Sequence, residues 1–585
     1  MSIYCLFLPL IPNKQDTNRT NIRMQNQYDL IIAGGGLAGL TLSLQLKKSN
    51  PDISILIMEY RDTIAPTAAH KVGESTVELA THYFREVLQL KDYLEEFELP
   101  KHGLRFFFKS NNKAEISNRL ELGPRLKLPV PSHQLDRGTF ENYLEKHTKE
   151  YGTEFMLGAR VKDVEFSENG HTVIYNHEEQ EKRLTARWVV DATSRFSLLK
   201  RKLGFQKPAD HNVNAVWYRL KGVIDIDDWS DNTTWKNFLA PKLRYLSTVH
   251  FMDKGYWVWV IPLGSKNTSI GIVADQDVHP FAEINTYEKA VTWMKKHEPL
   301  CAEKICPPKE ELMDFRILKH FCHNSGRIYS SDRWAVTGEA GAFLDPFYSP
   351  GSDFISLNNT WLSDLILRDL KGEDISIRAQ AYERTHLSWF ESWFPIYQYK
   401  YKLMGNTQIM VAKILWDWAI YWSIPCLIFT NKGFTDLKVL KALFMTEDGF
   451  GQKFGELNKR VQDMFIAWQP YETKILDNHY VDPLDLDYLR QFQQGIEEKL
   501  TPNELLKKVQ ENMTMLEHIA AELFRKISAE VHGTPKDMKV NPYTISLEKG
   551  AVIDTTSEAA LASDPAIAKD IDVIWYYDKP VFANS

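Results

Sequence analysis

The fold is decided by residues 28–59, YDLIIAGGGLAGLTLSLQLKKSNPDISILIME. An apolar run (28–33) is followed at once by the glycine-rich turn GGGLAG (34–39), then by a helical pattern and a second apolar run that ends in Glu59. The order of strand, glycine turn, helix and strand is typical of a βαβ unit that binds a dinucleotide. The sequence therefore predicts a Rossmann-like domain near the N-terminus.

Each glycine of the turn has a separate role in such a unit. Gly34 allows the tight turn, Gly36 lets the backbone approach a pyrophosphate, and Gly39 permits close packing of the helix on the strand. Glu59 lies 20 positions after Gly39, where a carboxylate accepts hydrogen bonds from the hydroxyls of an adenosine ribose. A carboxylate at this point favours an unphosphorylated ribose, so the motif indicates FAD or NAD rather than NADP.

The composition is that of a globular protein. The chain has 585 residues, of which 44% are hydrophobic and 25% charged, and this balance excludes a disordered, collagen-like or coiled-coil chain. A net charge of -7 gives no general attraction to nucleic acid or to an anionic membrane, and we expect no nucleic-acid partner. The five scattered cysteines are too few for a disulfide framework and favour a reducing, cytoplasmic setting.

The N-terminal residues have the character of a leader rather than of a structured element. The stretch 1–12, MSIYCLFLPLIP, is apolar, but no basic residue precedes it and no small-residue cleavage site follows it. A signal peptide is therefore not expected. Residues 1–27 are predicted to be a disordered leader, with Met24 as an alternative start.

Three further motifs lie downstream of the glycine turn. Residues 334–345, WAVTGEAGAFLD, and residues 187–195, RWVVDATSR, each give a strand that runs into a turn, and Arg137 stands where a helix is expected to begin. These motifs resemble those of the FAD-dependent aromatic hydroxylase superfamily. The resemblance implies that Arg137 steadies FAD and that the turn at Glu339 approaches the ribityl chain, with Glu339 in place of the more usual aspartate.

Within that superfamily the sequence resembles the flavin-dependent halogenases, the tryptophan halogenases and their phenol- and carrier-protein-acting relatives. The similar segments are VGEST (72–76), WVWVIP (257–262) and FLDPFYSPG (343–351), of which the WxWxIP pattern is the most specific. The alternation of the second segment also predicts a core strand with Trp257 and Trp259 on its inner face, and the two interpretations are compatible. In the family these tryptophans are thought to keep the substrate apart from the flavin.

The resemblance implies the cofactors, the partners and the reaction. Reduced FAD and oxygen oxidise a halide ion to hypohalous acid, which travels down a tunnel to a lysine beside an electron-rich ring. The substrate is a small aromatic compound or an acyl group on a carrier protein. Because the chain has no second glycine-rich nucleotide motif, we expect reduced FAD to come from a separate flavin reductase.

The lysine of this reaction is sought in residues 98–109, ELPKHGLRFFFK, which we predict to be a short loop that runs into a strand. Lys101 fits the placement in the phenol-acting relatives, whereas alignment with the tryptophan halogenases points to the position of Arg105. A buried lysine can lose its proton and act as a nucleophile or donor, but arginine stays charged. Lys101 is therefore the candidate and Arg105 the alternative.

The segment expected to hold the halide departs from the family. Halogenases commonly have Ser-Thr-Gly or Ser-Ser-Gly beside the flavin, whereas this chain has Ser349-Pro350-Gly351. Pro350 has no N–H to donate, which leaves Ser349 as a site residue and the amides of Gly351 and Ser352 for the halide.

The alternative function is an FAD-dependent monooxygenase, a hydroxylase or epoxidase that does not use halide. A third candidate is a flavin-binding scaffold without turnover.

Residues 389–429 hold 12 aromatic side chains in 41 positions and are predicted to be helical. The apolar run 414–429 is shorter than the roughly 20 residues that span a bilayer, and Asp417 and Pro425 interrupt it. We expect either core packing or an apolar wall over the substrate, and membrane contact is not expected. Aromatic walls suit an aromatic or acyl-chain substrate.

Six histidines and cysteines fall between residues 297 and 323: His297, Cys301, Cys306, His320, Cys322 and His323. Their spacing does not repeat the paired C-x2-4-C pattern of zinc sites. No metal site is predicted.

The predicted fold class is α/β, a Rossmann-like FAD-binding domain of the hydroxylase type with a mixed-sheet substrate region and a helical C-terminal region. Two local predictions are a loop at 449–458, GFGQKFGELN, and a strand at 572–577, DVIWYY. The expected organisation is a leader (1–27), the first part of the FAD-binding domain (28–204), a sheet-bearing substrate region (205–324), a return segment of the FAD-binding domain (325–375), a helical aromatic-rich substrate-covering region (376–535) and a tail (536–585).

Overall fold

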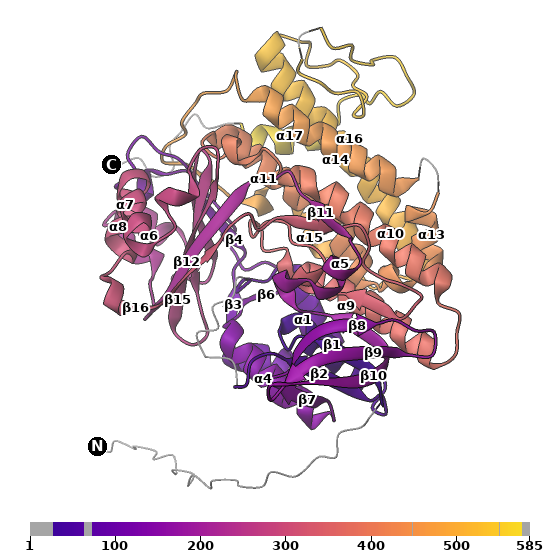
Figure 1. The fold of residues 1–585 in the computed structure, drawn as a ribbon. Helices are drawn as coiled ribbons and strands as arrows, with labels where there is room; N and C mark the ends of the chain where they lie inside the picture. The colour runs from indigo at the N-terminus through magenta and orange to yellow at the C-terminus, as the bar shows by residue number, and fades with distance from the viewer. Residues whose placement is uncertain (1–26, 64–72, 447–448, 549, 576–585) are drawn as a thin grey trace, which may run out of the picture.

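The computed structural model describes residues 27–63, 73–446, 449–548 and 550–575. It has a seven-stranded sheet, an eight-stranded sheet and a large helical region, so the predicted α/β class is confirmed (Figure 1). Apart from Gln27, the predicted leader lies outside the described residues, and so does Val72 of the VGEST segment.

The seven-stranded sheet has the strand order β7-β2-β1-β10-β9-β8, with β18 beside β10. Strands β1, β2, β7, β18 and the end of β10 run parallel, and β8 and β9 form antiparallel pairs. The helices α1 (Leu37–Ser49), α4 (Arg137–Glu150) and α9 (Gly351–Leu370) pack together against it. The strands are β1 (Gln27–Ala33), β2 (Ile55–Glu59), β7 (Glu154–Leu157), β8 (Arg160–Glu165), β9 (His171–His177), β10 (Gln180–Asp191) and β18 (Trp334–Val336).

The eight-stranded sheet has the order β16-β12-β15-β14-β13-β4-β5-β19. One face packs on a separate apolar core beneath α6 (Thr233–Phe238), α7 (Tyr287–His297) and α8 (Pro299–Ile305), and the other face belongs to the main core. The strands are β16 (Leu312–Leu318), β12 (Val213–Lys221), β15 (Asn267–Asp275), β14 (Tyr256–Pro262), β13 (Thr248–Asp253), β4 (Leu104–Phe107), β5 (Glu121–Leu122) and β19 (Tyr480–Val481).

The helical region follows α9 and lies beside both sheets (Figure 1). Its longest helix, α16, begins after a capping box in which Thr501 accepts from the backbone of Glu504 and Glu504 accepts from that of Thr501. The helices are α10 (Ser376–Trp393), α11 (Thr407–Tyr421), α12 (Leu427–Thr430), α13 (Leu437–Phe444), α14 (Phe450–Trp468), α15 (Asp487–Gly495), α16 (Pro502–His532) and α17 (Pro565–Val573).

Three local predictions are wrong. The stretch 449–458 is not a loop, because α14 begins at Phe450 and its apolar stripe packs against α10, α11 and α16. The strand predicted at 572–577 is not formed in its described part, because α17 runs to Val573 after a cap in which Asp564 accepts two backbone N–H groups, and residues 576–577 lie outside the described residues. Lys101 ends a short strand, β3 (Leu99–Lys101), which pairs with β6 (Ser132–Gln134), and is therefore not in a loop.

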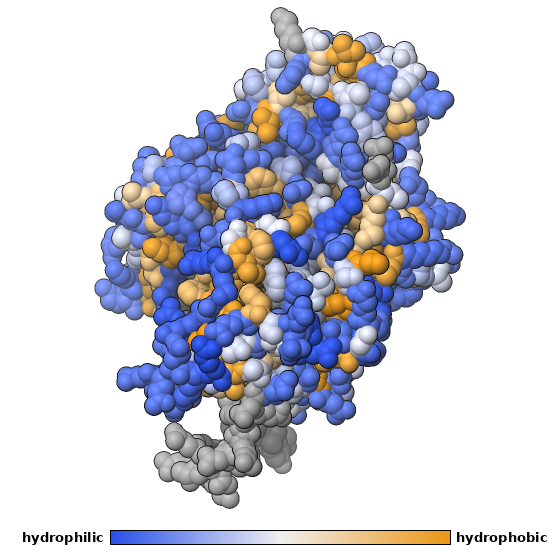
Figure 2. All heavy atoms as spheres, turned by 45° about the vertical axis from the view of Figure 1, so that its right-hand side comes forward, coloured by the Kyte–Doolittle hydropathy of each residue, from blue (hydrophilic) through white to orange (hydrophobic). Residues whose placement is uncertain are grey.

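The apolar run near residue 414 belongs to a longer helical segment than expected. Helix α11, a π-helical turn at Trp422–Cys426 that contains Pro425, and α12 follow one another over Thr407–Thr430. This segment is 24 residues long and apolar enough to cross a membrane, but 94% of its most apolar window is buried inside the protein. On the face shown in Figure 2, hydrophobic residues lie in separate small groups among hydrophilic ones. The segment is a core helix.

Candidate functional site

A large cavity, whose volume of about 1610 Å³ includes space open to solvent, lies between the seven-stranded sheet and the inner face of the eight-stranded sheet. Its wall comes from motifs that are far apart in the sequence but meet at the ends of β1, β10 and β18. The carboxyl ends of parallel strands are where open α/β sheets bind ligands. Predicted site residues on this wall are Gly36, Arg137, Trp257, Trp259, Glu339, Ser349, Gly351 and Ser352.

The glycine turn is shaped as the sequence predicts. Gly34 has a φ of +113°, and a Cβ there would lie 2.3 Å from the carbonyl oxygen of Ala192. A Cβ on Gly39 would lie 2.3 Å from the carbonyl oxygen of Gly34, which is the close packing of helix on strand. Gly36 precedes α1 and faces the large cavity, so unpaired N–H groups at the start of that helix are available to a phosphate.

The three charged residues predicted for the cofactor occupy different parts of this region. The Glu59 carboxylate is buried at the end of β2 and accepts from the Gly35 N–H at 2.7 Å, but it is not part of the cavity wall. Arg137 begins α4 and lies on the wall, with its Nη1 3.3 Å from the Gly73 carbonyl oxygen. Glu339 is also on the wall, where it accepts from the Ser194 hydroxyl at 2.6 Å.

The WxWxIP tryptophans form the opposite wall, and both interpretations of that strand apply. Trp257 and Trp259 are buried on the face of β14 that borders the large cavity, with ring centroids 5.6 Å apart. Gly271 on β15 makes room for Trp259, since a Cβ there would lie 2.2 Å from its ring. A third tryptophan, Trp217 on β12, was not predicted. Its indole N–H has no acceptor among the described residues, so it is available to a ligand.

Asp345 connects this wall to the helical region. Its carboxylate accepts from the Tyr401 hydroxyl at 2.9 Å and pairs with His211 Nε2 at 2.6 Å. Tyr401 in turn accepts from the indole N–H of Trp257 at 2.8 Å. The orientation of Trp257 is thus fixed by a residue 144 positions away in the sequence, which spacing along the chain could not reveal.

The segment that carries the Ser-Pro-Gly triplet is conformationally strained. Tyr348 and Ser349 have φ values of 70° and 62°, a left-handed conformation that non-glycine residues rarely adopt and that clusters at functional sites. The Ser349 N–H donates to the Pro346 carbonyl at 2.9 Å. Helix α9 starts at Gly351, so the N–H groups of Gly351 and Ser352 have no acceptor within the helix and lie beside the large cavity.

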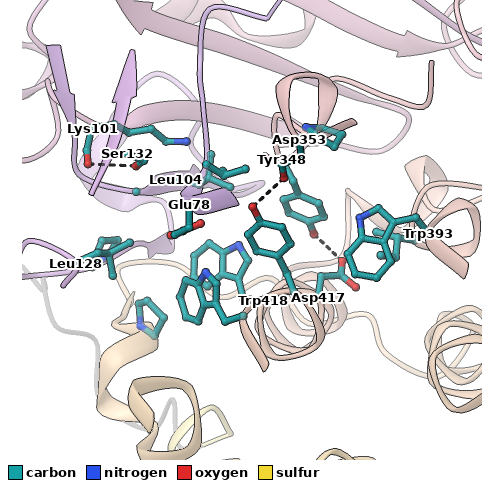
Figure 3. A pocket seen from close by; sticks show the side chains of 18 of the residues that line it. Glu78, Lys101, Leu104, Leu128, Ser132, Tyr348, Asp353, Trp393, Asp417 and Trp418 are labelled. Carbon is teal, nitrogen blue, oxygen red and sulfur yellow. Dashed lines mark hydrogen bonds between the residues drawn. The ribbon is translucent and has the colours of Figure 1, made fainter. Parts of the chain in front are cut away.

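A second cavity, the Lys101 pocket, has a volume of about 670 Å³ that includes space open to solvent, and a mostly apolar, aromatic wall (Figure 3). Lys101 is only 3% exposed, and its amine donates to the Thr76 carbonyl at 2.6 Å. Burial lowers the pKa of Lys101 to about 8, although the nearby carboxylates of Glu78 and Asp353 oppose this shift. The structure therefore places the predicted lysine in a buried pocket.

Arg105, the alternative, lies elsewhere. Its guanidinium is fully buried and forms an ion pair with Glu121 at 2.6 Å, and it also donates to the Pro124 carbonyl at 2.8 Å. Arg244 pairs with the same carboxylate at 3.0 Å. Arg105 thus belongs to a structural cluster under the eight-stranded sheet and is not part of the wall of the Lys101 pocket.

Two buried carboxylates in the Lys101 pocket were not predicted. Glu78 comes from α2 (Glu78–His82) and Asp353 from the first turn of α9. Asp353 accepts from the Ala80 N–H at 2.9 Å and from the Tyr421 hydroxyl at 2.8 Å. Burial raises the pKa of Asp353 to about 7 and also raises that of Glu78. The only sequence signal for Asp353 is its position four residues after Ser349.

The predicted aromatic region supplies the rest of this pocket, so it serves both as core and as a substrate wall. Trp418, Tyr421 and Trp422 come from the core helix over Thr407–Thr430, and Trp393 ends α10. Asp417 on the same helix accepts from the Tyr348 hydroxyl at 2.8 Å.

Of the described residues that line the two cavities, Pro350 alone belongs to both. Ser349 and Gly351 face the large cavity on one side of it, whereas Tyr348 and Asp353 face the Lys101 pocket on the other. A strained loop of a few residues thus separates the large cavity from a pocket that holds a buried amine. This is the arrangement that the resemblance to the halogenases implies.

Comparison with known proteins agrees with this geometry. Residues 27–292 match the family model described as an FAD binding domain. Over 436 residues, 68% of this chain and 70% of the relative, the sequence is 28% identical to the flavin-dependent halogenase chlA of Dictyostelium discoideum. It is 27% identical to the 1H-pyrrole-2-carbonyl-[peptidyl-carrier protein] chlorinase of Pseudomonas fluorescens, over 65% of this chain and 84% of that one. These similarities support the flavin-dependent halogenase family as the family of this chain.

The fold is also found in a solved halogenase structure. The crystal structure of halogenase PltM aligns with a TM-score of 0.62 at 16% identity and covers 83% of this chain and 96% of that chain. FAD is the family cofactor, and the glycine turn, the free N–H groups at the starts of α1 and α9, and the unpaired Trp217 N–H fit such a group. Among the described residues, no group of three or more His, Cys, Asp or Glu side chains is arranged to hold a metal ion.

Proposed function

We propose that this halogenase halogenates an electron-rich aromatic substrate in the Lys101 pocket, with FAD and halide in the large cavity. The observation that carries the proposal is the buried amine of Lys101, which lies in a pocket that meets the large cavity at Pro350. When bound, reduced FAD supplies with oxygen the oxidising equivalent that converts halide to hypohalous acid. The protein binds, separates and orients the reactants.

The large cavity and the Lys101 pocket each contribute their own residues to the proposed reaction. On the side of the large cavity, the N–H groups of Gly351 and Ser352 hold the halide at the start of α9, and Ser349 borders it. On the other side, the Lys101 amine holds the hypohalous acid next to the substrate ring. Asp353 accepts the proton that the substrate releases on substitution, because its raised pKa suits a base near neutral pH.

The substrate is an aromatic ring, either free or attached to a carrier protein. The aromatic wall suits a flat apolar ring, and the buried carboxylates suit a ring that bears a hydroxyl or N–H donor. The relative in Pseudomonas fluorescens is named as a chlorinase of a pyrrole-2-carbonyl group on a peptidyl-carrier protein. PltM, in contrast, has been crystallised with free phloroglucinol. We further propose that a separate flavin reductase supplies reduced FAD, and that the enzyme works in the cytoplasm.

The test is an aerobic incubation with FAD, a flavin reductase, NADH and bromide. Free phenols, indoles and pyrroles, and pyrrolyl groups on a carrier protein, are offered in parallel, and products are identified by mass spectrometry. We expect a bromine isotope doublet that disappears in Lys101→Ala and is not restored in Lys101→Arg, because arginine cannot lose its proton. FAD binding, followed by flavin fluorescence, should be unchanged in both variants.

The same incubation tests the alternative function. A product that gains one oxygen atom, at the same rate with and without bromide, would identify a monooxygenase and contradict the proposal. Retention of tightly bound flavin with no NADH-dependent oxygen consumption would instead indicate a flavin-binding scaffold.

A further inference from the structure

Three phenols of the protein itself line the Lys101 pocket, those of Tyr348, Tyr397 and Tyr421, and Tyr397 is only 3% exposed. Every residue of α11 is buried except Tyr421, which keeps accessible surface where it lines the pocket. Tyr348 is partly accessible in the same way. The indoles of Trp393, Trp418 and Trp422 are each no more than 6% exposed. Phenols are electron-rich rings, so the pocket wall has the same reactivity as the proposed substrate.

We propose that Tyr421 is a site of self-halogenation when no substrate occupies the Lys101 pocket. The inference rests on the proposed function, because that function supplies the hypohalous acid. In the step, a ring carbon ortho to the Tyr421 hydroxyl forms a bond to the halogen as the halogen–oxygen bond breaks. The ring then loses its proton, which leaves with the hydroxide as water. The ring carbon is oxidised and the halogen is reduced.

The surroundings of Tyr421 favour this reaction. Its hydroxyl donates to Asp353 Oδ2 at 2.8 Å and accepts from the Leu79 N–H at 3.2 Å, so the ring is held in one orientation beside the pocket. A hydroxyl that donates to a carboxylate increases the electron density of its ring. Asp353 also faces Lys101, where the hypohalous acid is delivered.

Tyr348 is less reactive for a reason that the structure also shows. Its hydroxyl donates to Asp417, but the amine of Lys413 lies 5.7 Å from its ring centroid. A cation over the ring face draws electron density from the π-system, so the ring reacts more slowly with an electrophilic halogen. Phe347 packs against the same ring with centroids 4.2 Å apart and limits access to it. Tyr421 is therefore the expected site.

The experiment uses the full-length enzyme with FAD, flavin reductase, NADH, oxygen and bromide, but no aromatic substrate. Tryptic peptides are then searched for bromotyrosine by tandem mass spectrometry. Tyr60, Tyr399 and Tyr471 are more than half exposed, at 72%, 53% and 54%, and report hypobromous acid that escapes into solution. Because Tyr421 lies beside the reagent, we expect its labelling to exceed theirs by at least about tenfold. Lys101→Met should abolish the excess.

Two matched controls keep the outcome interpretable. Tyr348→Phe, which alters the other accessible phenol, should leave the Tyr421 signal in place, and a phenol that the enzyme brominates should suppress that signal when added in excess. Labelling of the exposed tyrosines at or above the level of Tyr421 would overturn the proposal, since it indicates released acid. If an added phenol is brominated but Tyr421 is not, self-halogenation fails alone. If neither is brominated, the proposed function fails with it.

Discussion

The large cavity and the Lys101 pocket are neighbours, yet they are built in opposite ways. The large cavity is formed by glycine turns, strand ends and helix starts, so much of its wall is backbone. The Lys101 pocket is formed by side chains from β3, α2, α9 and the core helix over Thr407–Thr430, and these include a buried lysine and three buried carboxylates. The two meet at the strained loop around Pro350.

This contrast follows from what each cavity has to do. A nucleotide cofactor is recognised through backbone N–H groups and close approach, which depend on conformation more than on side-chain chemistry. A reactive pocket needs an ionisable group with a shifted pKa, and burial beside other charges provides it. Changes at the large cavity should therefore affect binding and folding, whereas changes at the Lys101 pocket should affect activity and pH dependence.

The largest effect is expected for Gly34→Ala. The added Cβ would lie 2.3 Å from the Ala192 carbonyl oxygen, at a φ of +113° that alanine rarely adopts. We expect complete loss of FAD binding and a loss of roughly 2–4 kcal/mol of unfolding free energy. Flavin fluorescence and thermal unfolding measure both. The matched control is Gly495→Ala, where the nearest atom to the new Cβ is 3.6 Å away, and normal FAD binding in Gly34→Ala would contradict the role of the turn.

Lys101→Met should separate stability from activity. We expect bromination to fall by at least about 10²-fold, because the reagent loses its amine. The unfolding free energy at pH 7 should nevertheless rise by about 1–3 kcal/mol, because a charged amine is no longer buried. A lysine with a purely structural role would show the opposite, a loss of stability with activity intact.

The gain in unfolding free energy expected for Lys101→Met should depend on pH, and its direction can be predicted. The pKa of Lys101 is about 8 in the folded protein and near 10.5 in the unfolded chain. Between these values the unfolded state binds more protons, so the unfolding free energy of the native enzyme rises with pH. The advantage of Lys101→Met should therefore shrink between pH 8 and 10, which thermal unfolding in a pH series can follow. A constant advantage would mean that the lysine is not desolvated.

Asp353→Asn should have a smaller effect, on the rate of bromination and on its pH profile. Because burial raises the pKa of Asp353 to about 7, bromination by the native enzyme should rise as the pH passes through 7 and the carboxylate ionises. Asparagine keeps the size and can still accept from the Ala80 N–H, but it does not ionise. We expect about a tenfold lower rate and no rise near pH 7. An unchanged pH profile would exclude Asp353 as the proton acceptor.

The difference between the cavities also explains how much could be predicted from the sequence. The βαβ unit, the WxWxIP strand and the flavin loop were predicted because their glycines, tryptophans and proline act at fixed spacing along the chain. Glu78, Asp353 and Trp217 were missed because their surroundings are set by tertiary packing. Lys101 was predicted only through the family resemblance, and it was wrongly assigned to a loop. Only the structure shows that Arg105 is locked to Glu121.

The smallest effect is expected at the rim of the Lys101 pocket. Pro124 and Leu128, in the loop between β5 and β6, line the pocket, and Arg125 ties this loop to Asp482 at 3.0 Å and to Asp485 at 2.7 Å. The Arg125 side chain is 42% exposed, so these ion pairs contribute at most about 1 kcal/mol. Arg125→Ala should therefore raise KM by no more than about fivefold, with kcat and FAD binding unchanged. Steady-state kinetics at low and high salt provide the test. Salt should weaken the ion pairs of the native enzyme, so the KM values of the native enzyme and the variant should converge at high salt. A large fall in kcat would show instead that the rim loop helps to position the reacting groups. The side chains that determine activity would then include those at the exposed rim of the Lys101 pocket.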